Sequence, residues 1–289
     1  MRLEITGLNV RFGARSVVDV DHLGADDAEI VGLAGESGSG KSMTTLAVLG
    51  LANTVGATMA GSIKLDGREL VGLPEKVLIG LRGSRIAAIF QSPSMAFNPV
   101  FRVGDVALRA LRRHGLTGSE ATGRVDQAMR GVLLSPDLLR RYPSQLSGGQ
   151  LQRVAIALAV ALRAEVLLAD EPTSALDVTV QAEVLELLRE LRSRDGMSVL
   201  FISHDLAVIA ELCDRVAVMQ AGSIVEQGPT DQIMSAPQHP YTVDLLRSVP
   251  AIEQCLPGGT TPPNPPAGPR PQWTWSSPAT AWRPGTGRR

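Results

Sequence analysis

The sequence is poor in cysteine and in long apolar runs, and each shortage excludes a class of protein. Its only two cysteines among 289 residues, Cys213 and Cys255, stand far apart, without a CxxC pair or a histidine at metal-binding spacing. A disulfide framework and a zinc site are therefore not expected, and a reducing compartment fits the sequence. The longest apolar run, residues 154–162, has about half the length of a membrane span.

The chain also lacks an excess of either charge and has few aromatic residues. The 28 Lys and Arg residues nearly balance 29 Asp and Glu, so the net charge is −1 at pH 7. No general positive field exists to hold a phosphate backbone, and three Trp, two Tyr and five Phe leave few rings for stacking on bases. We therefore expect no nucleic acid as a partner. The N-terminus does not resemble a signal peptide, because its apolar residues alternate with polar ones. We expect a soluble chain that works at a membrane only through other subunits.

The order of apolar segments predicts an α/β fold. Residues 1–31 alternate in polarity, which is typical of short antiparallel strands. From residue 150 onward, helices alternate with short apolar strands, and this pattern indicates a parallel sheet covered on both faces. The expected helices span 42–51, 150–164, 179–193 and 205–213, the expected strands 29–34, 61–66, 166–169 and 198–203, and a hairpin 216–227 with its turn at 221–222.

Two segments differ in composition from the rest. Residues 100–145 read as helical and carry eight Arg against four acids, which we interpret as a solvated helical face rather than a specific anion site. Residues 256–289 contain nine Pro and no acid, so we predict a flexible tail. A contact with a membrane surface or a permease is the alternative for the tail, because all three Trp lie there among four Arg.

A glycine-rich loop, GESGSGKS at residues 35–42, follows an apolar strand and opens a helix. This is the context that the GxxxxGK[ST] pattern requires, and it distinguishes the loop from a simple glycine turn before a helix. Its backbone N–H groups would face the oxygens of a polyphosphate. Lys41 would reach the β- and γ-phosphates, and the Ser42 hydroxyl would ligate Mg²⁺. The residues expected to bind ATP are Gly35, Glu36, Ser37, Gly38, Ser39, Gly40, Lys41 and Ser42.

Two acids follow the apolar stretch 166–169 directly. A carboxylate at the end of a buried strand is costly unless it meets a cation, and Mg²⁺ beside the phosphate loop supplies one. We therefore expect Asp170 to hold the metal. Glu171, one residue further on, is placed to accept a proton from the attacking water.

The segment LSGGQ at residues 146–150 lies between the phosphate loop and Asp170. With this segment in place, the sequence resembles the ATPase subunit of ATP-binding-cassette (ABC) transporters over about residues 1–250, with the motifs in the family's order. The resemblance implies that the signature contacts the γ-phosphate of a nucleotide held by a partner chain. The signature residues concerned are Ser147, Gly148, Gly149 and Gln150.

The resemblance assigns three further positions. Phe12 looks like the aromatic residue that stacks on adenine. Gln91 matches the glutamine loop that touches Mg²⁺ and the attacking water. His204 matches the switch histidine that bonds the γ-phosphate. The implied catalytic residues are thus Glu171, His204 and Gln91, and the implied Mg²⁺ ligands are Ser42, Gln91 and Asp170.

The resemblance also implies an architecture and partners. The expected fold is a P-loop NTPase core with a parallel sheet, an antiparallel β subdomain and an inserted helical subdomain near 92–150. The ATPase domain would span 1–250, and 251–289 would form the tail. The expected partners are a second ATPase subunit, identical or a paralogue, two transmembrane permeases and an extracytoplasmic solute-binding protein. The chain would then work peripherally, at the cytoplasmic face of the cell membrane.

Segments outside the catalytic motifs narrow the resemblance. DVTVQA at 177–182 and HPYT at 239–242 look like the oligopeptide, dipeptide and nickel importer branch, so import of short peptides is expected, with nickel or a metal chelate as the alternative. A soluble ABC ATPase acting on nucleic acid or ribosomes, and a nucleotide-binding regulator without turnover, are alternatives of other classes. Two features depart from the family: residues 26–29, DDAE, replace a Pro-Gly-Glu turn, and the lone Cys255 cannot build a four-cysteine cluster.

Overall fold

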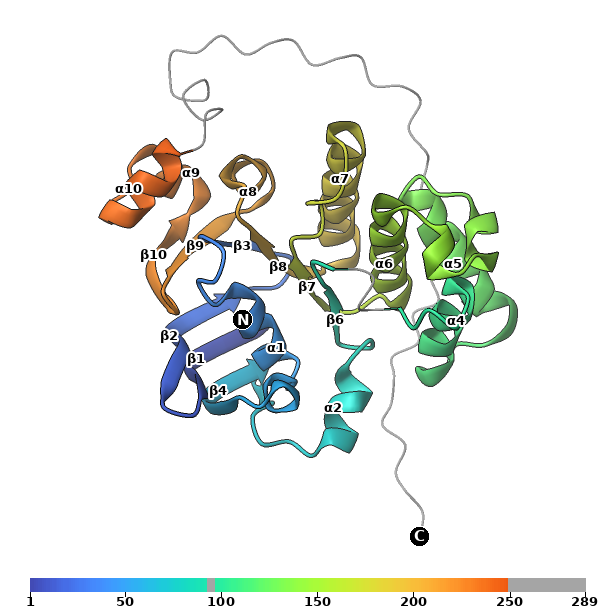
Figure 1. Cartoon of the computed structure of the whole chain (residues 1–289), viewed down its shortest axis with the longest axis horizontal. Helices are drawn as coiled ribbons and strands as arrows, with labels where there is room; N and C mark the ends of the chain where they lie inside the picture. Colours follow the sequence, from blue (N-terminus) through green and yellow to red (C-terminus); the bar gives the residue numbers. More distant parts are fainter. Residues whose placement is uncertain (93–96, 249–289) are drawn as a thin grey trace. The chain divides into compact units, whose positions relative to one another are not determined.

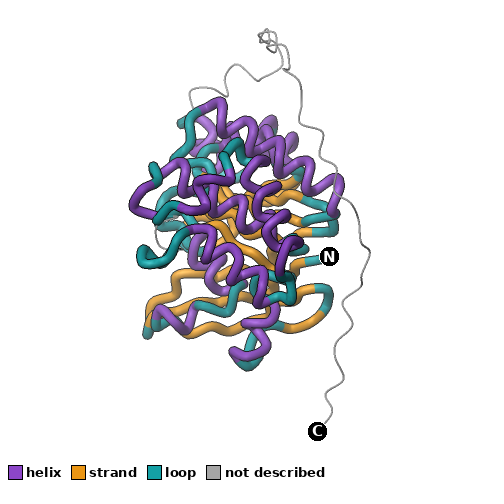
Figure 2. Tube along the Cα trace, turned by 90° about the vertical axis from the view of Figure 1, so that its right-hand side faces the viewer, coloured by secondary structure: helices purple, strands orange, loops and turns teal. Residues whose placement is uncertain are grey.

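Two β-sheets organise residues 1–92 and 97–248, the part of the chain that the computed structural model describes (Figure 1). The first sheet is antiparallel, in the order β2-β1-β4-β5, with β1 at Leu3–Phe12, β2 at Arg15–Ala25, β4 at Thr58–Leu65 and β5 at Arg68–Glu69. The second has the order β10-β9-β3-β8-β7-β6, and all its strands run parallel except β10. These strands are β3 (Ile30–Ala34), β6 (Ile86–Ile89), β7 (Val166–Asp170), β8 (Ser198–Ser203), β9 (Arg215–Gln220) and β10 (Ser223–Pro229). The antiparallel sheet lies below the parallel one in Figures 1 and 2.

Helices cover the parallel sheet, and one group of them packs beside its edge strand β6. Helices α4, α5 and α6 pack together, and α6 also contacts the edge strand β6 (Figure 1). The α-helices are α1 (Lys41–Val48), α2 (Glu75–Leu81), α4 (Val103–Arg113), α5 (Gly118–Gly131), α6 (Gly148–Leu162), α7 (Val178–Asp195), α8 (Leu206–Leu212), α9 (Thr230–Ser235) and α10 (Pro240–Arg247). Short 3-10 turns occupy Ala52–Val55, Pro136–Arg140 and Pro143–Gln145.

Both sheets share one apolar core. All residues of β3, β7 and β8 are buried, which is why these strands are mostly apolar, with polar residues only at the ends of β7 and β8. In the antiparallel sheet the buried side chains alternate with exposed ones, and Leu3 and Ile5 of β1 belong to the same buried cluster as Leu33 of β3 and Leu168 of β7. The antiparallel sheet is therefore packed on the parallel core by shared apolar burial.

The structure confirms the α/β prediction and most of the expected elements. The hairpin turns at Ala221 and Gly222, as expected. The strands β1 and β2 pair antiparallel, as expected for the first 31 residues, but they are ten and eleven residues long rather than short, and residues 30 and 31 already belong to the parallel strand β3. The helix expected over 42–51 ends at Val48, because Gly50 has a left-handed backbone with φ +67 and the chain turns there. The sequence did not predict β6 or α2. The tail lies outside the described residues.

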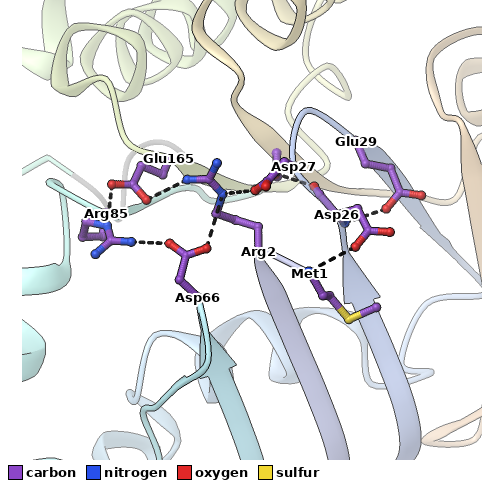
Figure 3. A network of polar contacts seen from close by, with 9 residues as sticks. Met1, Arg2, Asp26, Asp27, Glu29, Asp66, Arg85 and Glu165 are labelled. Carbon is purple, nitrogen blue, oxygen red and sulfur yellow. Dashed lines mark hydrogen bonds and ion pairs between the residues drawn. The ribbon is translucent and has the colours of Figure 1, made fainter. Parts of the chain in front are cut away.

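A network of ion pairs joins the antiparallel sheet to the amino ends of the parallel strands (Figure 3). Arg2 donates to Glu165 at 2.9 Å, just before β7, and is also paired with Asp27 and with Asp66. Arg85, just before β6, is paired with the same Asp66 and Glu165. Each arginine therefore bridges two or more carboxylates from different elements.

The acidic stretch 26–29, which departs from the family's usual turn, belongs to this network. The Met1 amino group pairs with Asp26 at 3.3 Å, and the Asp26 N–H donates to Glu29 at 2.7 Å. These contacts occupy the turn between β2 and β3 (Figure 3). The departure thus supplies ionic partners that fasten the N-terminus at the edge of the sheet opposite the site described below.

Replacing Arg2 with Met should lower the free energy of unfolding by about 1 kcal/mol at low salt, because a cation shared by three carboxylates is lost. The difference from the parent should shrink in 1 M salt, where screening acts within about 3 Å. Denaturant unfolding at both salt concentrations measures this. Lys64→Met is the matched control, since Lys64 meets only Glu4, at 3.9 Å. Equal effects of the two substitutions would contradict the network.

Candidate active site

The functional side chains expected from the sequence follow the carboxyl ends of four neighbouring parallel strands. The loop 35–42 follows β3, His204 follows β8, Asp170 ends β7 with Glu171 next to it, and Gln91 lies just past β6. The strand registers place the last residues of neighbouring strands within one residue of each other, so these ends lie at about the same level. Ligands of open α/β sheets bind at this edge. The fold thus gathers residues that are distant in sequence into one row.

The phosphate loop depends on glycine at its two ends. A Cβ on Gly35, whose φ is +149, would lie 2.2 Å from the Met219 carbonyl oxygen, and one on Gly40, whose φ is +110, would lie 2.8 Å from the Val17 carbonyl oxygen. Only glycine allows this close approach with such backbone angles. No side chain caps the N-terminus of α1 behind Gly40, so its N–H groups are available for an anion.

Lys41 begins α1 and its ammonium turns back into the loop. The Nζ donates to the Gly35 carbonyl at 2.7 Å and to the Glu36 carbonyl at 2.8 Å. The side chain is buried, and burial lowers its pKa, although the nearby carboxylates of Glu171 and Asp170 act in the opposite direction. A desolvated ammonium that is held in place suits a polyphosphate, because its charge acts more strongly there than in water.

Asp170 fits a site for Mg²⁺ beside this loop. Burial raises its pKa, and the charge of Glu171 adds to this, whereas a hydrogen bond with Ser42 and the charge of Lys41 lower it. A buried carboxylate with a raised pKa is stabilised as an anion by a cation. Within the described residues, no three His, Cys, Asp or Glu side chains gather at metal-binding distance. Mg²⁺ does not require such a cage, because it keeps waters and substrate phosphates as ligands.

Glu171 lies between Gln91 and His204. The Gln91 amide donates to one carboxylate oxygen at 2.9 Å, and His204 Nδ1 lies 3.0 Å from the other. The backbone of Glu171 is left-handed, with φ +48, and its N–H donates to the Ile202 carbonyl at 2.9 Å. Such strain in a residue other than glycine marks functional sites when surrounding contacts enforce it. Glu171 and His204 line a pocket together with Thr173, Ser174, Leu176, Gln181, Ser203, Asp205 and Val208.

The signature segment lies at the start of α6, away from the phosphate loop. Ser147 caps α6, accepting from the Gln150 N–H at 3.2 Å while the Gln150 side chain accepts from the Ser147 N–H at 3.1 Å. Because α6 packs on β6, three strand positions from β3, about 14 Å of sheet separates it from the strand that carries the phosphate loop. Among the described residues, no hydrogen bond joins 147–150 to 35–42. The structure therefore does not bring the signature to the chain's own loop.

Two aromatic residues extend the description of the site. Phe12 ends β1 and is 37% exposed, so its ring is accessible, but no contact in the structure assigns it to a nucleotide. Tyr241 of α10 was given no chemical role by the sequence, yet its hydroxyl accepts a hydrogen bond from the Glu36 N–H at 3.0 Å. The two residues are 205 positions apart, so no local pattern could have indicated this contact.

The strand–loop–helix unit at 30–48 and the acids that end β7 define the chain as a P-loop NTPase. The family model described as ABC transporter matches residues 19–174, which is more than half of the chain. A second model, the oligopeptide/dipeptide transporter C-terminal region, matches residues 225–270. The chain belongs to the ABC transporter family and is one of its ATPases.

Known relatives agree with this membership over most of their length. A Brucella abortus protein, named provisionally as a peptide import ATP-binding protein, is 45% identical over 88% of this chain and 79% of its own. The Escherichia coli dipeptide transport ATP-binding protein DppD is 42% identical over 87% of this chain and 79% of its own. A solved dimeric ATP-binding cassette, in a post-hydrolysis state with ADP and Pi, is similar with a TM-score of 0.70 and 26% identity, covering 79% of this chain and 98% of that one.

Replacing Glu171 with Gln should keep MgATP binding and lower the rate of ATP hydrolysis by about 10²–10⁴, the usual contribution of a positioned base. The amide has nearly the shape of the carboxylate but does not take up a proton. Steady-state ATPase assays on the assembled complex measure the effect. Glu186→Gln on the exposed face of α7 is the matched control and should leave the rate unchanged. A rate for Glu171→Gln within threefold of the parent would contradict its role as the base.

Proposed function

We propose that this chain is the ATP-hydrolysing subunit of an importer of short peptides. The observation that carries the proposal is the similarity to peptide and dipeptide import ATP-binding proteins, which spans 87–88% of the chain. The match of residues 225–270 to the oligopeptide/dipeptide transporter C-terminal region supports the same solute class. No feature of the described residues favours nickel or a metal chelate, and the balanced charge does not favour nucleic acid.

Each residue of the row has a role in hydrolysis under this proposal. The loop N–H groups and Lys41 bind the polyphosphate, and Asp170 with the Ser42 hydroxyl would hold Mg²⁺, which would neutralise charge on the phosphate oxygens. Glu171 takes the proton of the attacking water, oriented by Gln91. His204 bonds the γ-phosphate. Its contact with Glu171, at 3.0 Å, supports this assignment, because the imidazole lies beside the proposed base.

The signature is proposed to act on a nucleotide bound by a second ATPase subunit, identical or paralogous. The distance of about three strand spacings between β3 and the edge strand beside α6 supports this arrangement. The similar solved cassette is a dimer with ADP and Pi, which is consistent with it. Phe12, at the accessible end of β1, is proposed to stack on adenine.

The remaining partners are proposed from the family. Across the described residues, no helix has both the length and the apolar character to cross a bilayer. Two permeases would therefore provide the path, with an extracytoplasmic solute-binding protein delivering the peptide. The chain would act at the cytoplasmic face of the cell membrane. Residues 1–250 would form the ATPase domain, with its helical subdomain about 92–150, while the tail lies outside the described residues.

Replacing Lys41 with Ala should abolish both ATP binding and peptide uptake, because the fixed positive charge of the loop is lost. Nucleotide titration of the purified chain and uptake of a labelled dipeptide by vesicles containing the complete transporter measure the two effects. Lys64→Ala on the antiparallel sheet is the control and should change neither. If the complete parent transporter hydrolysed ATP without responding to peptide and without taking peptide up, the proposal of a peptide importer would be refuted. If Lys41→Ala bound ATP with unchanged affinity, the phosphate-loop assignment would be refuted.

Replacing Ser147 with Arg should leave MgATP binding by the isolated chain unchanged but abolish hydrolysis in the assembled complex. The bulky cation would occupy the place where the signature meets the partner's nucleotide. Titration of the chain alone and ATPase assays on the complex separate the two outcomes. A folded Ser147→Arg chain that had lost ATP binding on its own would show that the signature acts within its own subunit.

A further inference from the structure

One peptide unit of the phosphate loop is held from both sides. The carbonyl of Gly35 accepts from Lys41 Nζ at 2.7 Å, and the N–H of the same peptide, on Glu36, donates to the Tyr241 hydroxyl at 3.0 Å. In a trans peptide these two groups point in opposite directions. The lysine ammonium and the tyrosine hydroxyl therefore fix the orientation of the peptide plane between them.

The orientation of this peptide depends on these two hydrogen bonds. Gly35 is close to β9, where a Cβ would lie 2.2 Å from the Met219 carbonyl oxygen, so the start of the loop cannot move toward that strand. Beyond Gly35, hydrogen bonds help to limit rotation of the Gly35–Glu36 peptide, because the glycine on one side of it has wide backbone freedom. Rotation would withdraw the carbonyl from Lys41.

Several contacts fix the helix that carries Tyr241. The Glu226 carboxylate on β10 accepts from the backbone N–H of Gln238 at 2.7 Å and of His239 at 3.0 Å. His239 in turn caps α10 by accepting from the Tyr241 N–H at 3.2 Å, and Pro240 occupies the first helical position. The contacts of Gln238, His239 and Pro240 thus set the direction in which the Tyr241 side chain extends from the helix.

The charge of Glu226 is suited to this anchoring role. Burial raises its pKa, but the backbone hydrogen bonds from Gln238 and His239 and the nearby Thr242 hydroxyl outweigh that effect and hold the pKa below its ordinary value. The carboxylate therefore stays ionised at neutral pH and accepts from the helix N-terminus, where a negative charge is favourable.

We infer that Tyr241 is a positioning residue of the phosphate loop: its hydroxyl holds the Gly35–Glu36 peptide in the orientation that seats Lys41. The inference rests on the proposed ATPase function, because seating Lys41 matters only if the loop binds a polyphosphate. It gives the HPYT segment a physical task. His239 and Pro240 start the helix, and Tyr241 connects it to the loop.

The test uses the two tyrosines of the chain as a matched pair. Tyr241→Phe removes only the hydroxyl, and the dissociation constants of MgATP and MgADP should each rise about threefold to tenfold, the range for one lost hydrogen bond. Tyr142→Phe makes the same change on the far helical region and should leave both constants unchanged. Equal dissociation constants for the parent and Tyr241→Phe would overturn the inference.

A second measurement separates positioning from simple destabilisation. In the assembled transporter, Tyr241→Phe should raise the KM for MgATP with kcat almost unchanged, because Glu171, Gln91 and His204 are untouched. A merely destabilised variant would instead contain fewer active molecules, which lowers the apparent kcat and leaves KM unaltered. That second pattern would overturn the positioning role.

Glu226→Ala tests the route through α10. It should weaken MgATP binding when Tyr241 is present and add little in the Tyr241→Phe background, because both changes act on one contact. Additive effects would show that Glu226 acts on the loop without Tyr241 and would overturn this route.

Lys41→Ala separates a failure of the proposed function from a failure of the present inference about Tyr241. If it binds MgATP normally, the proposed function fails, whereas loss of binding there with no effect of Tyr241→Phe overturns only the present inference.

Discussion

The buried charges Lys41 and Asp170, at the carboxyl edge of the parallel sheet, constrain the rest of the structure. Charged side chains in apolar surroundings are tolerated only when they have polar partners, and the neighbouring groups of the fold supply such partners. Carbonyl groups of the loop accept from the ammonium, and the Ser42 hydroxyl bonds the carboxylate. Three features bring these polar groups together above the apolar core: glycines with left-handed backbones, a helix without a side-chain cap, and four strand ends at about the same level.

The ion pairs that stabilise the fold and the candidate active site lie at opposite ends of the parallel strands. At the amino ends of the strands, Arg2 and Arg85 bind the antiparallel sheet to the parallel core through shared carboxylates. At the carboxyl ends, Glu171 has a strained backbone and its side chain is held between Gln91 and His204. Strain is tolerated there because the core fixes β7, which precedes the turn, and β8, whose Ile202 carbonyl accepts from the Glu171 N–H.

The C-terminal part of the described chain belongs to the same system. Helix α10, which follows the last strand of the parallel sheet, reaches the phosphate loop through one hydroxyl group. Glu226 and His239 order the start of that helix by local hydrogen bonds. The HPYT segment, which the sequence offered only as a mark of the family branch, thus lies in direct contact with the loop that is proposed to bind the polyphosphate.

The sequence by itself determined the features that depend on neighbouring residues: the glycine loop with Lys41 and Ser42 at the start of a helix, and the buried strand ending in Asp170. Local spacing fixes these, because a loop, a strand end and a helix start each require particular residues in succession. It did not reveal the short strand β6, whose four residues carry too little periodicity, or the end of α1 at Val48. Only the tertiary structure decided that Gln91 and His204 meet on Glu171 and that Tyr241 holds Glu36. Those contacts join residues 33 to 205 positions apart, and their pairing follows from strand order and helix packing, which no local pattern encodes.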